Sequence, residues 1–319
     1  MKIVLTGSLS IDQIMNFDGL FESMIHKDKL DVLSISVLIQ NLRRTRGGIA
    51  GNIAYSLSLL GEQPILYGSI GKEQKTYMRA LARKGVNIDH VHYSDLPTAT
   101  FSVITDKNNC QVGGFYPGAM GDASSLTLEP FADQDVLTVI SAHDPAQMEV
   151  QIDACARMNK PLFFDVGQQV IILPESVLHK GVETAQLLIL NDYEMGVLSK
   201  RIGKSVPEII KSVKVCVITL GEKGSKIYAQ DTNWEEQHTP AVAISGVVDP
   251  TGAGDAFRAG FLYGYVRDWP HTQSAQLGAT LAAYAIEKVG TQEHKPSLAQ
   301  IMKRYYNQYK EQINLKRAQ

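Results

Sequence analysis

The sequence predicts an α/β protein with a mainly parallel sheet covered by helices on both faces. Short β-branched or apolar runs alternate with longer amphipathic segments along the chain. These runs are apolar throughout, which is typical of parallel strands that are buried on both faces. With 319 residues, of which 44% are hydrophobic, the chain is long enough for one large domain or a domain with an appendage.

Six of the apolar runs are predicted as core strands: Ile3–Thr6, Ile65–Tyr67, Val136–Ile140, Leu162–Asp165, Leu187–Leu190 and Val215–Leu220. Between them, apolar residues from Ile49 to Leu60 mark one face of a helix that Gly61 can end. Gly85 has the same position after Glu73–Lys84. This alternation predicts parallel strands joined by right-handed crossovers.

Two segments depart from the alternation. Residues Thr98–Tyr116 are predicted as a hairpin, and Asp12–Arg46 holds further strand-like sequence, including Val32–Ile39. Together they predict a small second sheet over one edge of the main sheet, a candidate lid. Because Val32–Ile39 is unusually apolar for a peripheral strand, we expect a homodimer formed through this lid.

Charge, apolar runs and cysteine content each exclude a class of protein. The chain has 31 Lys and Arg against 33 Asp and Glu, a net charge of −2, which argues against nucleic-acid or anionic-membrane binding. No apolar run approaches the ~20 residues of a membrane span, and the N-terminus lacks the apolar core of a signal peptide. We therefore expect a cytoplasmic protein. Its three widely spaced cysteines exclude a disulfide framework.

The most informative motif is the run Asp249-Pro250-Thr251-Gly252-Ala253-Gly254-Asp255. A turn with two glycines followed by an apolar helix exposes backbone N–H groups, which bind phosphate with the help of the helix dipole. Asp255 falls in the first helical turn, beside the expected phosphate. A carboxylate there can accept the proton of a hydroxyl that attacks the phosphoryl group.

Two other nucleotide-binding motifs fit the glycine-rich runs poorly, whereas a purely structural role for Asp255 stays open. A Rossmann loop would require glycine where Phe257 stands, and a Walker A loop at Gly203-Lys204-Ser205 would require glycine in place of Leu198. Asp255 can also be an acid that only stabilises the helix dipole. The run by itself does not distinguish this last role from catalysis.

Three further motifs lie at predicted strand or helix ends. Gly47-Gly48 precedes a helix that has Asn52 in its first turn. Asn191 and Glu194 follow a strand and stand one helical turn apart, and Thr219–Gly224 ends the next strand with a glycine turn. The carboxyl ends of parallel strands are where open α/β sheets bind ligands.

With these four elements in this order, the sequence resembles the PfkB/ribokinase family of carbohydrate and nucleoside kinases over essentially the whole chain. Gly47–Gly71 is similar to the first family signature and Asp249–Gly260 to the second, with its Gly-Ala-Gly-Asp core. The resemblance implies a three-layer α/β/α core of residues 1–11, 47–92 and 118–319. It also implies a β-sheet lid of residues 12–46 and 93–117.

The resemblance further implies the site. Asp255 would be the general base, with the amides of Gly252, Ala253 and Gly254 as the anion hole. Asn191 and Glu194 would hold Mg²⁺ through water, and ATP would bind at Asn191, Thr219, Gly221, Gly224, Gly252 and Gly254. Substrate would bind at Ser8, Asp12, Gly47, Gly48 and Asn52, with the Asp12 carboxylate accepting hydrogen bonds from two adjacent hydroxyls. Asp249 and Thr251 would either form a potassium site or only shape the turn.

The expected activity is ATP-dependent phosphorylation of the primary 5′ hydroxyl of a ribonucleoside, with adenosine converted to AMP. The adenosine-kinase branch is favoured because Phe101 and Phe115 can clamp a flat base, although both can also simply pack within the lid. Val166 departs from that branch, where proline is expected. A sugar or sugar-phosphate kinase, with Arg43, Arg44 and Arg46 as phosphate ligands, is the first alternative. A ligand sensor without catalysis is the second.

Overall fold

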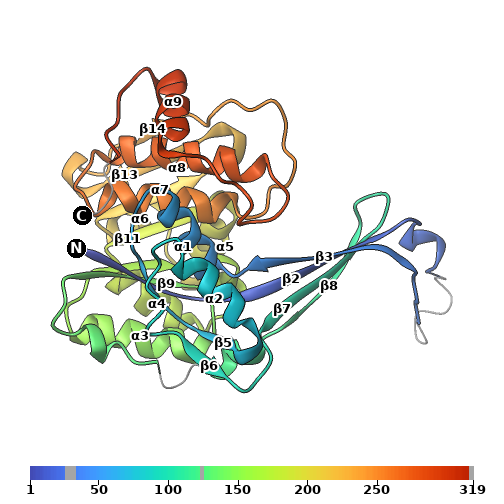
Figure 1. The fold of residues 1–319 in the computed structure, drawn as a ribbon. Helices are drawn as coiled ribbons and strands as arrows, with labels where there is room; N and C mark the ends of the chain where they lie inside the picture. Colours follow the sequence, from blue (N-terminus) through green and yellow to red (C-terminus); the bar gives the residue numbers. More distant parts are fainter. Residues whose placement is uncertain (26–33, 123–125, 316–319) are drawn as a thin grey trace.

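The core of the protein is an eight-stranded sheet (Figure 1), seen in a computed structural model that describes residues 1–25, 34–122 and 126–315. From one edge to the other, its strands are β14 (Gln237–Thr239), β13 (Ser225–Ala229), β12 (Val215–Thr219), β11 (Leu187–Asn191), β10 (Leu162–Asp165), β9 (Val136–Ser141), β1 (Lys2–Thr6) and β4 (Ile65–Tyr67). β4 to β12 in this order are parallel, and β13 and β14 are antiparallel. The predicted fold class is confirmed.

Helices cover both faces of this sheet, which explains why its central strands are largely apolar. One face packs against α1 (Ile49–Leu59), α2 (Lys75–Ala82), α7 (Ala253–Tyr265), α8 (His271–Ile286) and α9 (Leu298–Tyr309). The other packs against α3 (Pro145–Arg157), α4 (Glu175–Thr184), α5 (Asp192–Ile202) and α6 (Val206–Ser212). Side chains along β11 alternate between the two faces: Leu187 and Ile189 pack on the first face, and Leu188 and Leu190 pack on the second. Within the described residues, no helix is long and apolar enough to cross a membrane.

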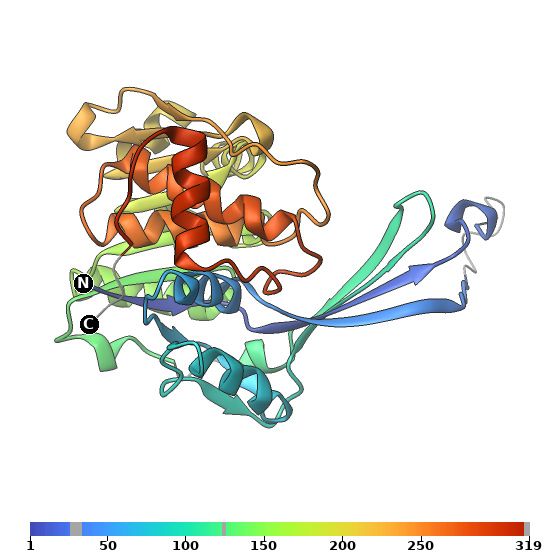
Figure 2. The same cartoon turned by 45° about the horizontal axis from the view of Figure 1, so that its top comes forward.

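A second sheet of four strands leaves the core as an arm, which we call the projecting sheet (Figures 1 and 2). Its order is β3 (Ile39–Gly47), β2 (Ser10–Phe17), β7 (Ala99–Thr105) and β8 (Gln111–Tyr116). β7 and β8 form the hairpin that the sequence predicts. The short strands β5 (Ser69–Gly71) and β6 (His92–Ser94) pair separately with each other.

The register of the projecting sheet gives it two distinct faces. Asp12 lies opposite Thr45 on one side and Phe101 on the other, and Phe101 lies opposite Phe115. Because paired residues share a face, these four side chains form one row, on what we call the Asp12 face. The reverse face carries an apolar row across the same four strands: Leu42, Met15, Ile104 and Val112.

The prediction of strand structure at Val32–Ile39 is wrong for its described residues other than Ile39. Residues Ser34–Leu38 form no strand, and Val32 and Leu33 lie outside the described residues. Phe17 ends β2 and pairs with Ile39, so the residues before Ile39 have no neighbouring strand to pair with. The strand instead runs from Ile39 to Gly47.

Candidate active site

The first turn of α7 is the centre of the site. Gly252 caps this helix with φ = 80°, a left-handed conformation that favours glycine. A Cβ at this position would lie 2.9 Å from Cγ2 of Thr291, so the neighbouring loop also requires glycine there. Of the predicted anion-hole amides, that of Ala253 makes a long 3.3 Å bond to the Pro250 carbonyl. The first N–H groups of a helix have no partner within the helix and are available to an anion.

Asp255 lies half-buried in this turn, beside α1. The Asn52 Nδ2 atom donates a hydrogen bond of 2.8 Å to Asp255 Oδ2. Burial raises the pKa of Asp255, against the opposing effects of the Arg258 charge and the Asn52 hydrogen bond. A carboxylate with a raised pKa is a better proton acceptor, so the environment suits a general base.

Arg258, one turn further along α7, anchors the helix to the sheet. Its Nε donates to Oδ1 of Asp165, at the end of β10, at 2.8 Å, and its Nη2 lies 3.9 Å from Glu194. Burial raises the pKa of Asp165 to about 6, although the Arg258 charge opposes this rise. A Cβ on Gly254 would lie 2.6 Å from Arg258 Nη1, so the second glycine of the motif leaves room for the guanidinium.

Sequence reasoning missed Arg258. The available signal was a single arginine within the otherwise apolar stretch Ala256–Leu262. An arginine that points into a core needs a buried acid, and Asp165 ends a predicted strand. The partner itself was not identifiable from the sequence.

Asn191 and Glu194 lie at the start of α5, next to the same charges. The Asn191 Oδ1 atom accepts a 2.7 Å bond from the Glu194 amide, and Glu194 Oε2 accepts a 2.9 Å bond from the Asn191 amide. This reciprocal pattern is a capping box, so both residues have a structural role in addition to any metal contact.

Asp12, the predicted substrate carboxylate, lies close enough to Asp255 to be affected by its charge. Burial raises the pKa of Asp12 to about 6, and the negative charges of Asp255 and Asp249 raise it further, while a hydrogen bond from Ser10 opposes the rise. Gly47 faces Asp12 directly, because a Cβ at residue 47 would collide with the carboxylate. The predicted substrate residues Asp12 and Gly47 therefore lie together.

Ser8 and Gly48 shape the start of α1. The Ser8 Oγ atom accepts a 3.1 Å bond from the Ile49 amide, and Gly48 caps the helix with φ = 89°. A Cβ on Gly48 would lie 2.7 Å from the Leu9 Cα. Both residues border the site, and the contacts observed for them are structural.

Asp249 ties the turn before α7 to the loop after α8. Its two carboxylate oxygens accept 2.9 Å bonds from the amides of Thr251 and Gly290. Burial alone would raise the pKa of Asp249, but these hydrogen bonds outweigh it and hold the pKa below its usual value. This geometry fits the turn-forming role, and the potassium site remains a prediction.

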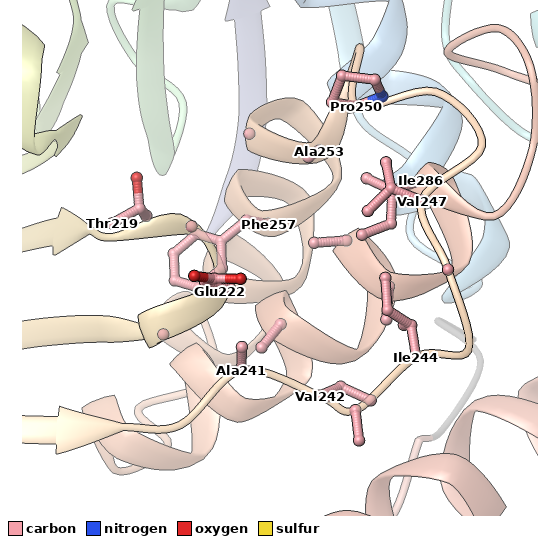
Figure 3. A pocket seen from close by; sticks show the side chains of 18 residues that line it. Thr219, Glu222, Ala241, Val242, Ile244, Val247, Pro250, Ala253, Phe257 and Ile286 are labelled. Carbon is pink, nitrogen blue, oxygen red and sulfur yellow. The ribbon is translucent and has the colours of Figure 1, made fainter.

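A cavity of about 590 Å³ opens beside Gly254. Thr219, Gly221 and Gly224 line it from the end of β12, as the sequence predicts, and Phe257 lines it from α7. Figure 3 shows the other labelled apolar side chains around this cavity, among them Ala241, Val242, Ile244, Val247 and Ile286. The segment from Ala241 to Val247 was not predicted. Such a mostly apolar cavity next to an anion-binding helix start suits a nucleotide.

Phe101 and Phe115 lie further along the Asp12 face. Their side chains are 39% and 50% exposed, so they are available to a ligand. Phe101 lies over Gly113, where a Cβ would be 3.2 Å from the ring. Neither ring is buried in a lid core of its own.

Several known proteins are similar to this chain in sequence or in fold. A nucleoside kinase of Methanocaldococcus jannaschii is 28% identical over 306 residues, which cover 95% of this chain and 96% of that protein. The structure of Burkholderia thailandensis nucleoside kinase in complex with inosine superposes with a TM-score of 0.86 at 30% identity, covering 97% and 99% of the two chains. A 6-phosphofructokinase of Thermoanaerobacterium thermosaccharolyticum is 25% identical, with 81% and 84% covered.

Fold, site and relatives together define a phosphotransferase that acts on a hydroxyl group. Residues 2–298 match the model of the pfkB family of carbohydrate kinases, and the chain belongs to that family. The family predicted from the sequence is thus confirmed.

Replacing Arg258 with methionine is expected to lower the free energy of unfolding by about 3–5 kcal/mol, because Asp165 would stay buried without its partner. Urea unfolding measures this loss. Arg267→Met is the matched control. Arg267 lies just beyond the end of α7 and its guanidinium pairs at 2.6 Å with Glu62, and both of these side chains are more exposed than those of the Asp165–Arg258 pair. The double variant Arg258→Met/Asp165→Leu should recover much of the loss. An equal loss in Arg267→Met would contradict the special role of the Asp165 pair.

Proposed function

We propose that the protein is an ATP-dependent kinase that phosphorylates the 5′ hydroxyl of a ribonucleoside, with adenosine as the expected substrate and AMP as product. The observation that carries this proposal is the row of Asp12, Phe101 and Phe115 on one face of the projecting sheet. A nucleoside presents a diol next to a flat base. The row presents a carboxylate next to two exposed aromatic rings.

Each part of that row matches one part of the ligand. A carboxylate can accept hydrogen bonds from both the 2′ and the 3′ hydroxyl of ribose. Opposed residues in neighbouring strands have Cβ atoms about 4.5–5.5 Å apart, which places an aromatic ring beside the ribose site. Base–aromatic stacking contributes about 1–3 kcal/mol. The nucleoside kinases among the relatives, one of them solved with inosine, support the same substrate class.

Phosphoryl transfer follows from the placement of the remaining groups. ATP would occupy the 590 Å³ cavity, with its γ-phosphate at the amides of Gly252–Gly254. Asp255 would accept the proton of the 5′ hydroxyl as that oxygen attacks. Asp12 would hold the ribose so that the hydroxyl stays in line.

The acidic groups near Arg258 suit a magnesium ion. Glu194 offers a carboxylate, and Asp165 Oδ2 is buried without a hydrogen-bond partner among the described residues. Oxygen ligands of this kind, together with water and phosphate, are those that Mg²⁺ prefers. Bound there with the nucleotide, the ion would neutralise charge on the transferred phosphoryl group.

The projecting sheet would act as the lid that the sequence predicts at residues 12–46 and 93–117, of which residues 26–33 lie outside the described part of the chain. Its root joins the core where β3 ends at Gly47 and α1 begins. Closure over a bound nucleoside would exclude water and protect ATP from hydrolysis.

A sugar-phosphate kinase is the second candidate, and one observation favours it. Arg43 lies on the Asp12 face, because its partner Ile14 is two residues from Asp12 in β2. Its charge lowers the pKa of Asp249, so it is near the site. Arg44 and Arg46 lie on the reverse face, and Arg46 stacks over Tyr77. Binding of one substrate phosphate by all three arginines is therefore not supported.

The two candidates differ in ADP formation across a substrate panel. We expect turnover of adenosine and inosine to exceed that of ribose and fructose 6-phosphate. Phe101→Ala should raise KM for the nucleoside about 5- to 150-fold, the equivalent of one stacking contact, and leave KM for ribose unchanged. Tyr116→Ala is the matched control, because Tyr116 is exposed next to Phe115 but on the opposite face. Faster turnover of fructose 6-phosphate would exclude the nucleoside, and nucleotide binding without any ADP formation would indicate a sensor.

Replacing Asp255 with asparagine is expected to lower kcat about 10²- to 10⁴-fold, since a general base contributes in that range. Steady-state kinetics measures the effect, and circular dichroism checks the fold. Glu175→Gln is the control, because Glu175 is an exposed acid in the first turn of α4 and has the same relation to a helix dipole. Near-normal turnover in a folded Asp255→Asn variant would remove Asp255 from this role.

We also propose a homodimer through the projecting sheet, formed by its reverse face. Leu42 and Val112 are 56% and 59% exposed in the apolar row of that face, which a second copy can cover. Light scattering should give a dimeric mass for the protein and a monomeric mass for Val112→Glu. Val150→Glu, at an exposed valine of α3, is the control and should remain dimeric. A monomeric mass for the unaltered chain would contradict the proposal.

A further inference from the structure

A buried hydrogen-bonded network joins the proposed base to the root of the lid. It is built from side chains on α1, α2 and the loop after α8, and it ends on backbone carbonyls of β3. Asn52, Tyr77, Thr291 and Gln292 are its side chains, and each is at most 5% exposed. These residues are far apart in the sequence: 215 positions separate Tyr77 from Gln292.

The groups at the two ends of this network determine which atom donates and which accepts in each hydrogen bond between them. At one end, Tyr77 must donate to the Gly47 carbonyl, which lies 3.0 Å away, so the hydroxyl accepts from Gln292 Nε2 at 2.6 Å. At the other end, the Asp255 carboxylate is an acceptor, so Asn52 presents Nδ2 to it at 2.8 Å. The Asn52 Oδ1 atom then accepts the second hydrogen of Gln292 Nε2 at 2.9 Å.

Thr291 strengthens the same arrangement. Its hydroxyl lies 2.8 Å from Asn52 Oδ1 and 2.9 Å from the Arg46 carbonyl, two acceptors that share its one hydrogen. Its methyl group packs where a Cβ on Gly252 would lie. Thr291 therefore contacts both the partner of the base and the anion hole.

A network of this kind resists rearrangement. Turning the Asn52 amide over would bring its carbonyl oxygen against the Asp255 carboxylate and its NH₂ group against Gln292 Nε2. Buried groups that lose their partners cost about 1–3 kcal/mol each. The Asn52 amide is thus held on the base, and its predicted contact with substrate stays a prediction.

The end of β3 makes this linkage relevant to catalysis. Gly47 faces the Asp12 carboxylate, which in the proposed function holds the ribose. The network thus joins the element beside the ribose site to Asp255 through bonds that are buried up to the half-buried base. In the proposed function, the network would therefore set the distance between the base and the hydroxyl that Asp12 positions.

We propose that Gln292, together with Thr291 and Tyr77, is a positioning residue for phosphoryl transfer that acts through the Asn52 amide on Asp255. The inference rests on the proposed function, in which Asp255 is the general base. A misplacement of about 1 Å can lower turnover on the order of 100-fold. The Gln292 amide bonds to Asn52 and Tyr77, and in the proposed function it has no contact with the nucleoside, so its loss should lower kcat with little change in KM.

Gln292→Met, which keeps the side-chain length and removes the hydrogen bonds, tests the proposal in the full-length protein with ATP and adenosine. We expect kcat to fall about 10- to 100-fold with KM for adenosine little changed. Gln151→Met is the matched control, because Gln151 is a buried glutamine of α3 that bonds to the Leu126 carbonyl at 3.3 Å. It should lose stability and keep its kcat. Thr291→Val should also lower kcat, and Thr291→Ser, which keeps the hydroxyl, should recover most of that loss.

A double-mutant cycle separates this inference from the proposed function. If Gln292 acts through Asp255, adding Gln292→Met to Asp255→Asn leaves the residual turnover unchanged. A further decrease by the same factor as in the single variant would overturn the inference, as would a wild-type kcat for Gln292→Met. Near-normal turnover of Asp255→Asn alone would instead refute Asp255 as the base, which is the separate failure of the proposed function.

Discussion

The buried ion pair between Arg258 and Asp165 determines where the site is built. It fastens α7 to the end of β10, so the first turn of α7 lies over the carboxyl edge of the sheet. A charged pair of this kind is costly to bury, and loss of Arg258 would leave the buried Asp165 carboxylate unpaired. The Gly-Ala-Gly motif adapts to the same pair, since Gly254 gives the guanidinium its space.

This anchoring explains how a chain with a net charge of −2 can attract phosphate. The site is rich in acids: burial raises the pKa of Asp12, and the charges of Asp255 and Asp249 raise it further. The positive potential must therefore be local. Backbone amides at the start of α7 and the buried Arg258 supply it from the protein, and in the proposed function Mg²⁺ adds to it.

The core strands were predictable because burial on both faces leaves a signal within each strand's own sequence. A strand that is buried on both faces is apolar at every position, as Leu187–Leu190 shows. The strand Ile39–Gly47 was not recognised at its true position, because a strand exposed on both faces carries polar residues such as Gln40 and Arg44. The apolar residues just before it attracted the prediction instead, although they have no strand to pair with.

Site residues that belong to a local sequence motif were predictable, and those paired across distant segments were not. Glycine turns and the first-turn acid are local signals, and they located Asp255, Gly221 and Gly224. Arg258–Asp165 and Tyr77–Gln292 are pairs between distant segments, and nothing local to either residue identifies its partner. Asn52 shows the same limit: its position was predictable, but the three groups that orient its amide were not.

The electrostatics of the acceptor side bear on the choice between substrates. Asp12 and Asp255 both have pKa values raised by burial, and Asp249 lies close enough to add to that of Asp12. A neutral nucleoside would place hydroxyl donors against two of these carboxylates and so relieve their repulsion. A substrate that carries its own phosphate would add two negative charges to the same surroundings, with Arg43 to offset them from the Asp12 face. The balance of charge therefore favours an uncharged acceptor, in agreement with the aromatic rings that lie beside Asp12.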